Sequence, residues 1–259
     1  MAYVRKAQSR DRDTSWQKVA GRYHKSVGRS GSYFHQQVVL PGAVKLLGLK
    51  PGDALLDLGC GQGVLARAVR QDIEYSGIDL APELIRLAMD HNRNPRFQFQ
   101  TGDIAKPLKL DKKREFTHAA IILALQNVED YQTVFANAAK FLKSGSKFLI
   151  VINHPAFRIP RQTSWGIDEK SKLQYRRVNI YMSPLKVPVD MGPGSDHKLT
   201  WSFHNPLSAY VAGLAKSGFV VSNIEEWVSD KESEGRSAKM ENRSRAEIPV
   251  FMAILCQKK

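Results

Sequence analysis

Apolar and polar positions follow two different periods along the chain from residue 51 onward. Short runs of β-branched and aliphatic residues predict buried strands, whereas apolar residues spaced three or four apart predict helices. Strands alternating with helices form a mostly parallel sheet. We therefore expect an α/β, doubly wound, Rossmann-like fold of seven strands with helices on both faces, the last two strands paired as a hairpin. The expected strands are 54–58, 74–78, 97–100, 116–122, 147–152, 219–224 and 248–256, and the expected helices are 64–70, 81–90, 131–142 and 206–217.

Two segments lie outside this alternation. Residues 1–50 are helical in part and rich in Tyr, His and Arg, which predicts an N-terminal helical cap. Residues 155–200 follow the fifth strand, and a structureless loop of that length is uncommon in a compact domain. Strand-like composition at 175–181 and 198–203 predicts an inserted hairpin or lid. We expect residues 1–259 to form a single domain, divided into the cap at 1–50, a cofactor-binding half at 51–154, a lid and acceptor insertion at 155–200 and the rest of the sheet at 201–259.

Length and composition exclude several classes of protein. The chain has 259 residues, 42% of them apolar, which suffices for a full hydrophobic core. Its two cysteines cannot form a disulfide framework and are too few for a structural zinc site, and the seven histidines show no metal-ligand spacing. No apolar run approaches the ~20 residues of a membrane helix, and the N-terminus lacks the apolar segment of a secretory signal. We expect a soluble, cytoplasmic protein with no metal and no membrane span.

Positive charge is concentrated in the two outlying segments. The net charge is +14; residues 1–50 carry ten Lys and Arg against two Asp, and residues 155–200 carry eight against four acids. A basic surface favours an anionic partner, either nucleic acid, an anionic membrane surface or an acidic small substrate, although such charge also serves solubility alone. The charge therefore leaves the partner open.

The strongest motif is the run Leu-Asp-Leu-Gly-Cys-Gly-Gln-Gly at 56–63, between a predicted strand and a predicted helix. Glycines there allow a sharp turn with positive φ and a close approach of the backbone to a ligand. The helix N-terminus beyond supplies free N–H groups and the positive end of its dipole. A dinucleotide fingerprint would need a glycine at Val64, so the spacing favours another adenosine compound.

This run, with Asp57 two residues before its first glycine, resembles the first motif of class I S-adenosylmethionine-dependent methyltransferases. The resemblance continues in order through Gly-Ile-Asp at 77–79, Gly-Asp-Ile at 102–104 and the apolar run 121–125. It implies S-adenosylmethionine as the cofactor. In the family the acid after the second strand binds the ribose hydroxyls, the acid after the third strand binds the adenine amino group, and Tyr and His of a cap approach the methionine end. Carried onto this sequence, the cofactor-binding residues are Asp57, Gly59, Cys60, Gly61, Gly63, Asp79, Leu80, Asp103, Ile104, Ile122, Tyr33 and His35.

The acceptor side carries weaker signals. Methyl transfer from a sulfonium is an in-line displacement in which alignment supplies most of the catalysis, and a general base helps when the acceptor must lose a proton. Neither cysteine is placed for attack on cytosine carbon, and the chain has no Asn/Asp-Pro-Pro-aromatic motif of base-amine methyltransferases. Asp130 is expected to cap the helix that follows it rather than to bind a metal. The candidate catalytic residues are His154, after the fifth strand, and His204, in a stretch that resembles the aromatic-His-x-Pro-Leu stretch of quinone-type methyltransferases.

Aromatic residues interleaved with arginines in the insertion suit a flat anionic acceptor, or equally a small core of the lid itself. The leading interpretation is a methyltransferase that acts on a small molecule, either anionic or aromatic. One alternative is an RNA or protein methyltransferase that uses the basic N-terminus, with binding that weakens steeply as salt rises. A second is a non-catalytic S-adenosylmethionine-binding protein. The sequence does not indicate the oligomeric state.

Overall fold

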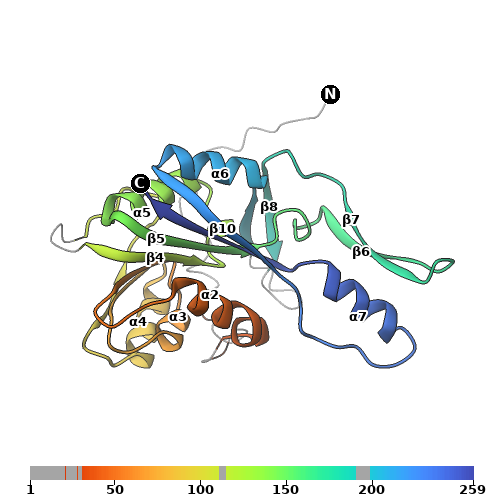
Figure 1. Ribbon diagram of the computed structural model, residues 1–259, viewed down its shortest axis with the longest axis horizontal. Coiled ribbons are helices and arrows are strands. Elements are labelled where there is room, and N and C mark those ends of the chain that lie inside the picture. The colour runs from red at the N-terminus through yellow and green to blue at the C-terminus, as the bar shows by residue number, and fades with distance from the viewer. Residues whose placement is uncertain (1–20, 22–27, 29–30, 111–114, 191–198) are drawn as a thin grey trace.

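The computed structural model describes residues 21, 28, 31–110, 115–190 and 199–259 and contains the expected central sheet (Figure 1). Its seven strands lie in the order β10-β11-β5-β4-β1-β2-β3. The pairs β1–β2, β1–β4, β2–β3 and β4–β5 are parallel, and β11 runs antiparallel to both its neighbours. The strands are β1 (Ala54–Leu58), β2 (Glu74–Asp79), β3 (Phe97–Thr101), β4 (Phe116–Ile122), β5 (Leu142–Asn153), β10 (Phe219–Trp227) and β11 (Phe251–Lys258).

Helices cover both faces of the sheet, as the sequence predicts (Figure 1). One face packs on α2 (Leu40–Leu47), α3 (Val64–Ala68) and α4 (Pro82–His91), and the other on α5 (Tyr131–Phe141) and α6 (Leu207–Lys216). Neighbouring residues of a strand point to opposite faces. Accordingly Leu55 belongs to the core of the first face and Leu56 to that of the second. This alternation explains why β1 is apolar at every position except Asp57.

Two of the predicted helix boundaries have the expected chemistry. Asp130 caps α5, because its carboxylate accepts a hydrogen bond from the N–H of Thr133 at 3.0 Å. Gly218 follows α6 with a φ of +82°, which only glycine adopts without strain. The expected N-terminal cap falls mostly outside the described residues; its described helical part is a π-helical turn, η1 (His35–Val39), that continues into α2.

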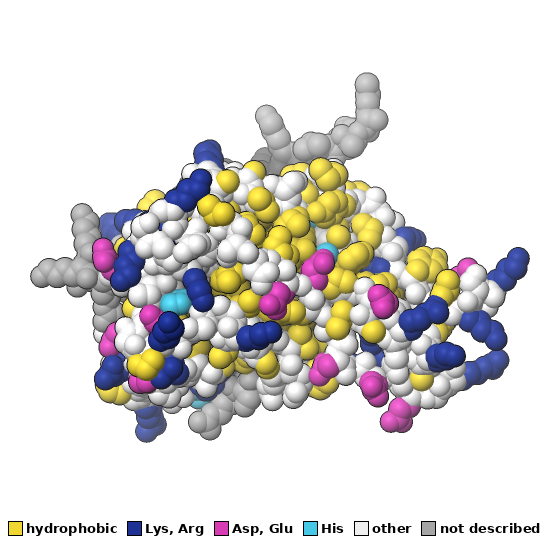
Figure 2. Space-filling view, in the orientation of Figure 1, with side chains coloured by type: hydrophobic (Ala, Val, Ile, Leu, Met, Phe, Trp, Pro, Cys, Tyr) yellow, Lys and Arg dark blue, Asp and Glu magenta, His cyan; other side chains and the backbone are white. Residues whose placement is uncertain are grey.

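The insertion after β5 contains two hairpins where the sequence predicts an added hairpin or lid. Strands β6 (Thr163–Asp168) and β7 (Leu173–Val178) form the first, and β8 (Leu185–Asp190) and β9 (Leu199–His204) form the second. The β6–β7 hairpin extends from the core beside a further helix, α7 (Ala238–Glu247) (Figure 1). In Figure 2, Lys and Arg side chains gather along the outer edge of this extension.

The expected hairpin between the last two strands needs correction. Strands β10 and β11 are antiparallel neighbours, but α7 lies in the long connection between them. The sequence of α7, AKMENRSRAE, is polar on nearly all sides, and so it lacks the apolar spacing that predicts a helix. Its place is set by contact with the β6–β7 hairpin, where Ser244 Oγ donates to Gln174 Oε1 at 2.5 Å. No helix among the described residues is long and apolar enough to span a membrane.

Candidate functional site

The glycine-rich turn between β1 and α3 lies at the carboxyl edge of the sheet, beside the point where the strand order reverses between β1 and β4. Gly59, Gly61 and Gly63 have φ values of +77°, +54° and +72°. A Cβ on Gly59 would lie 2.6 Å from that of Ala124, and one on Gly63 would lie 2.7 Å from Asn92 Nδ2. Side chains are therefore excluded at both ends of the turn, and the backbone itself forms its surface.

Asp79 at the end of β2 fixes this turn. Its Oδ2 accepts the N–H of Gly61 at 2.8 Å, and its Oδ1 accepts the N–H of Ala81 at 2.9 Å. Burial raises the pKa of Asp79, and the backbone hydrogen bonds oppose that rise. A carboxylate oxygen can accept two hydrogen bonds, so each oxygen of Asp79 can still accept one from a ligand hydroxyl. The structure thus brings Asp79 to the glycine turn, as the motif order predicts.

Asp57 and Cys60 lie beneath the turn. The carboxylate of Asp57 is 2% exposed and accepts the hydroxyl hydrogen of Tyr75. Burial raises the pKa of Asp57 to about 7; the Tyr75 hydrogen bond opposes the rise, and the charge of Asp79 adds to it. The Cys60 thiol packs on β2 at Gly77, where a Cβ would lie only 2.8 Å from the Cys60 Sγ. Both side chains therefore support the turn from below, and only the backbone of Cys60 contributes to its surface.

The remaining predicted cofactor residues of the core lie at adjacent strand ends. Leu80 follows β2, Ile122 ends β4, and Ile104 is buried after β3. Asp103 accepts the N–H of Ala105 through Oδ1, at 3.0 Å, and pairs with Lys106 through Oδ2, at 3.0 Å. Since the carboxyl ends of parallel strands form one crevice at the switch point, these residues and Asp79 share a single edge of the sheet.

Asn137 was not predicted from the sequence, although it fixes the segment that carries Asp103. It is buried on α5, and its Nδ2 donates to the carbonyl oxygens of Ile104 (3.0 Å) and Lys106 (2.8 Å), while its Oδ1 accepts the N–H of Leu108 (3.0 Å). The available signal was a polar residue among the apolar positions of this helix. A buried amide with three satisfied hydrogen bonds specifies a unique loop conformation.

The two cap residues occupy different places. A Cβ on Gly31 would lie 3.1 Å from Val64 Cγ1 and 2.7 Å from His35 Cβ, so this segment sits against the start of α3. The ring of His35 bonds to Ser32 through Nδ1, at 2.8 Å. Tyr33 is instead 43% exposed, and its hydroxyl donates to Asp230 at 3.0 Å. The structure thus brings His35 near the glycine turn, whereas Tyr33 contacts the connection after β10.

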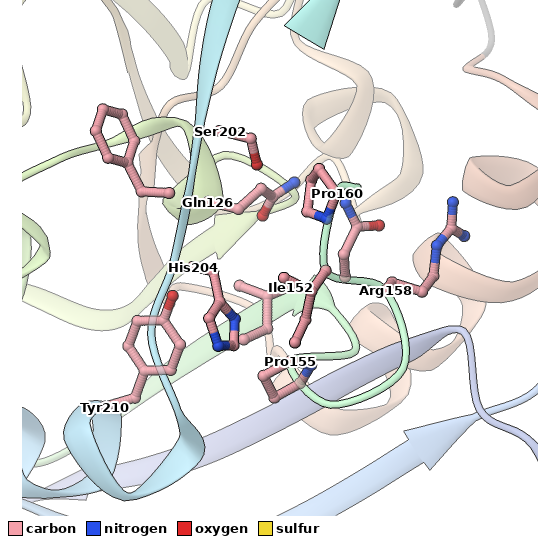
Figure 3. A pocket seen from close by; sticks show the side chains of 11 residues that line it. Gln126, Ile152, Pro155, Arg158, Pro160, Ser202, His204 and Tyr210 are labelled. Atoms are coloured by element: carbon pink, nitrogen blue, oxygen red, sulfur yellow. The ribbon is translucent and has the colours of Figure 1, made fainter. Parts of the chain in front are cut away.

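A small cavity lies beside this crevice, over the end of β5 (Figure 3). Its volume is about 20 Å³, the room of roughly one water molecule. The walls come from the short helix η2 (Leu125–Asn127), β5, the segment 155–160, β9 and α6. The lining residues include Gln126, Ile152, Arg158, Ser202, His204 and Tyr210.

His204 is held in a defined tautomer in this cavity. Its Nε2 lies 2.6 Å from the carbonyl oxygen of Tyr181, which can only accept, so Nε2 carries the proton and Nδ1 is an acceptor. Burial lowers the pKa of His204, partly offset by the hydrogen bond to Tyr181. The imidazole is therefore neutral at neutral pH, which is the state that a general base requires.

The structure does not bring His154, the other catalytic candidate, to the cavity wall. Its Nε2 donates to Glu226 Oε1 at 2.6 Å, and its Nδ1 accepts the N–H groups of Ala156 (3.2 Å) and Phe157 (3.3 Å). The chain turns at Pro155, so the ring is buried and stacks on Phe157 with 4.7 Å between centroids. This geometry corrects the expectation: both nitrogens are engaged, which favours a role in positioning the 155–158 turn.

The segment that follows β4 contains two features that the sequence did not reveal. Leu123 has a φ of +52°, a strained conformation for a residue with a branched side chain, and its N–H donates to Val151 at 2.7 Å. Gln126 donates from Nε2 to the carbonyl oxygen of Leu123 at 2.8 Å, and its buried Oε1 has no hydrogen-bond partner within the described ranges. Among the described residues, no group of three or more His, Cys, Asp or Glu could hold a metal.

The strand order, the glycine turn after the first strand and the acids after the second and third match the fold and motif order expected of a class I S-adenosylmethionine-dependent methyltransferase. Residues 55–145 match the family model described as a methyltransferase domain. This match assigns residues 55–145 to a methyltransferase domain, and the chain shares the fold of solved S-adenosylmethionine-dependent methyltransferases.

Individual relatives agree with this assignment. The chain is 33% identical over 120 residues to a demethylmenaquinone methyltransferase of Tropheryma whipplei. The matched region covers 44% of this chain and 47% of the relative. The chain thus matches about half the length of that curated relative. An S-adenosylmethionine-dependent methyltransferase from Mesorhizobium loti has the same fold, with a TM-score of 0.65 and 22% identity over 84% of this chain and 96% of the other. The structure of a glycopeptide N-methyltransferase complexed with sinefungin is also similar, with a TM-score of 0.58 and 16% sequence identity. The match covers 85% of this chain and 92% of the other.

Proposed function

We propose that this protein transfers the methyl group of S-adenosylmethionine to a small molecule, either anionic or aromatic, by in-line displacement. One short segment carries the proposal: Ala124 contacts Gly59 of the glycine turn, and Gln126, two residues on, lines the cavity. The expected cofactor site and the cavity are therefore neighbours along the carboxyl edge of the sheet. The name of the Tropheryma relative, a demethylmenaquinone methyltransferase, supports an aromatic small-molecule acceptor.

The residues at this edge fit the cofactor. The backbone of the glycine turn offers a surface free of side chains, and Asp79 has acceptor capacity for the two ribose hydroxyls. Asp103 suits the adenine amino group, and Leu80 and Ile104 provide apolar contacts for the ring. When bound, S-adenosylmethionine supplies an electrophilic methyl group on a sulfonium.

The cavity residues suit the acceptor. His204 Nδ1 can take a proton from an acceptor hydroxyl. Oε1 of Gln126, which has no partner among the described residues, can accept a hydrogen bond from the same molecule. A cavity of about 20 Å³ is too small for an aromatic ring, so the segment 155–160 must move when the acceptor binds. Closure over the bound acceptor then excludes water and fixes the angle of attack.

Transfer of label from S-adenosylmethionine into a cell extract tests the function directly. After reaction, the extract is separated by size into small molecules and macromolecules. We expect label among the small molecules, and less of it with the Asp79→Ala variant, which should bind the cofactor more weakly. Label in RNA or protein would favour a macromolecular acceptor instead, and no label in either fraction despite cofactor binding would favour a non-catalytic binding protein.

The assignment of Asp79 gives a separate prediction. Asp79→Ala should weaken S-adenosylmethionine binding by about 1–3 kcal/mol, because hydrogen bonds from two hydroxyls to a charged group are lost. Titration calorimetry measures the change. Asp53→Ala, which removes an acid beside Lys50 before β1, is the control and should bind normally. Equal affinity of the Asp79 variant and the native protein would disprove the ribose assignment.

A further inference from the structure

Arg158 is an exposed residue at the rim of the cavity. Its stem lines the cavity, and its guanidinium points away from His204 (Figure 3). The guanidinium carbon lies 5.6 Å from the centroid of the Phe251 ring. Among the described residues, no carboxylate pairs with it and no acceptor takes a hydrogen bond from its guanidinium. Partial burial lowers the pKa of Arg158, and so does the positive charge of Arg176.

Arg176 of β7 approaches the same place from the insertion. Its Nε donates to the carbonyl oxygen of Phe157 at 2.7 Å, and its Nη2 donates to Thr163 Oγ1 at 2.8 Å. The guanidinium also lies over the Trp165 ring, 5.2 Å from its centroid. Because Phe157 directly precedes Arg158, these contacts anchor Arg176 at the turn that carries Arg158, and the charge of Arg176 acts on the pKa of Arg158. The guanidinium of Arg176 is thus immobilised, and some of its N–H donors have no acceptor among the described residues.

The two like charges therefore lie within electrostatic reach of each other, and no acid in the part of the chain that the structure describes pairs with either. Glu226 of β10, the carboxylate bound at this turn, pairs with His154. Holding two cations close together has an electrostatic cost, which an anion between them would remove. Planar guanidinium groups also match the oxygens of a carboxylate or a phosphoryl group in paired hydrogen bonds.

We propose that Arg158 and Arg176 form an anion-binding subsite that holds a carboxylate or phosphoryl group of the methyl acceptor. The proposal rests on the proposed function, and it divides the acceptor into two ends. The anionic end lies at the arginines, and the end that receives the methyl group lies at the cavity, near His204.

Arg177 provides a matched control for charge. It neighbours Arg176 on β7, so it points to the opposite face of the hairpin, and its side chain is exposed. Arg158→Gln and Arg177→Gln remove the same charge from the same part of the molecule. The guanidinium of Arg158 bonds to no described group, so its loss should not disturb the fold, which thermal unfolding can confirm.

Calorimetry with inorganic pyrophosphate and with benzoate, in the presence of S-adenosylhomocysteine, tests the subsite and distinguishes the two anionic groups. We expect the native protein and Arg177→Gln to bind at least one of these probes with similar affinity. Arg158→Gln should bind it about 10- to 100-fold more weakly, as expected for loss of a paired, charge-assisted hydrogen bond. Binding of neither probe, or equal binding by the two variants, would overturn the proposal.

A second experiment uses the enzyme reaction. The small molecules of a cell extract are divided on an anion exchanger at pH 7, and each pool is offered with labelled S-adenosylmethionine. We expect label from the retained, anionic pool, with KM raised about 10- to 100-fold by Arg158→Gln and little change in kcat. Label only from the unretained pool would refute the subsite while leaving the methyltransferase intact. If neither pool accepts label although the cofactor binds, the proposed function fails, and the calorimetry alone decides whether the arginines bind anions.

Discussion

Replacing His204 with glutamine is expected to lower kcat by about 10²- to 10⁴-fold, the usual contribution of a general base. Glutamine can still donate a hydrogen bond to the carbonyl oxygen of Tyr181, but it cannot take a proton from the acceptor. Binding of S-adenosylmethionine should remain unchanged, because His204 lies on β9, in the wall of the neighbouring cavity. The measurement is steady-state transfer to the acceptor identified by labelling.

The pH profile separates this role from a structural one. Burial lowers the pKa of His204 below its ordinary value of 6.5, so kcat of the native protein should rise with pH below 6.5 and then level off. The glutamine variant should lack this rising limb. His118→Gln is a matched control, because it removes another buried histidine, on β4, that bonds to Thr117 at 2.8 Å. A loss in kcat below tenfold for His204→Gln would mean that the acceptor reacts without help from this base.

Asp57→Asn is expected to change how stability depends on pH. The folded-state pKa of Asp57 is about 7, against an ordinary value of 3.8, because the carboxyl is buried. Between these two values the folded protein holds a proton that the unfolded chain has released, so stability falls as pH rises from about 4 to 7. At about 1.4 kcal/mol per pKa unit, the shift from 3.8 to about 7 sets an upper bound of about 4 kcal/mol on the full effect.

The variant removes this titration while leaving an oxygen that can accept the Tyr75 hydroxyl. Its free energy of unfolding should match that of the native protein near pH 4 and exceed it by up to about 4 kcal/mol at pH 8. Urea denaturation at several pH values measures both. Asp79, whose pKa burial also raises, is present in both proteins, so its own titration contributes to both curves. A difference that stays constant with pH would contradict the raised pKa of Asp57.

The sequence alone determined the sheet and the cofactor edge. Strand β1 has the bounds that its apolar run predicts, and the other core strands begin or end within a few residues of their predictions. This success has a local cause, because a buried parallel strand must be continuously apolar and a tight turn with positive φ requires glycine. The positions of Asp79 and Asp103 then follow from topology, since parallel strands place their carboxyl ends at one edge.

Only the tertiary structure decided the acceptor side. His154 and His204 looked equivalent in the sequence, yet one binds Glu226, 72 residues away, and the other lines the cavity. Helix α7 is polar on nearly all sides, so its place depends on contact with β7 rather than on a periodic pattern. The contact of Arg176 with the turn that carries Arg158 likewise depends on the register of a hairpin. Such long-range contacts are set by how segments pack together, and a local pattern of apolar and polar residues carries no record of them.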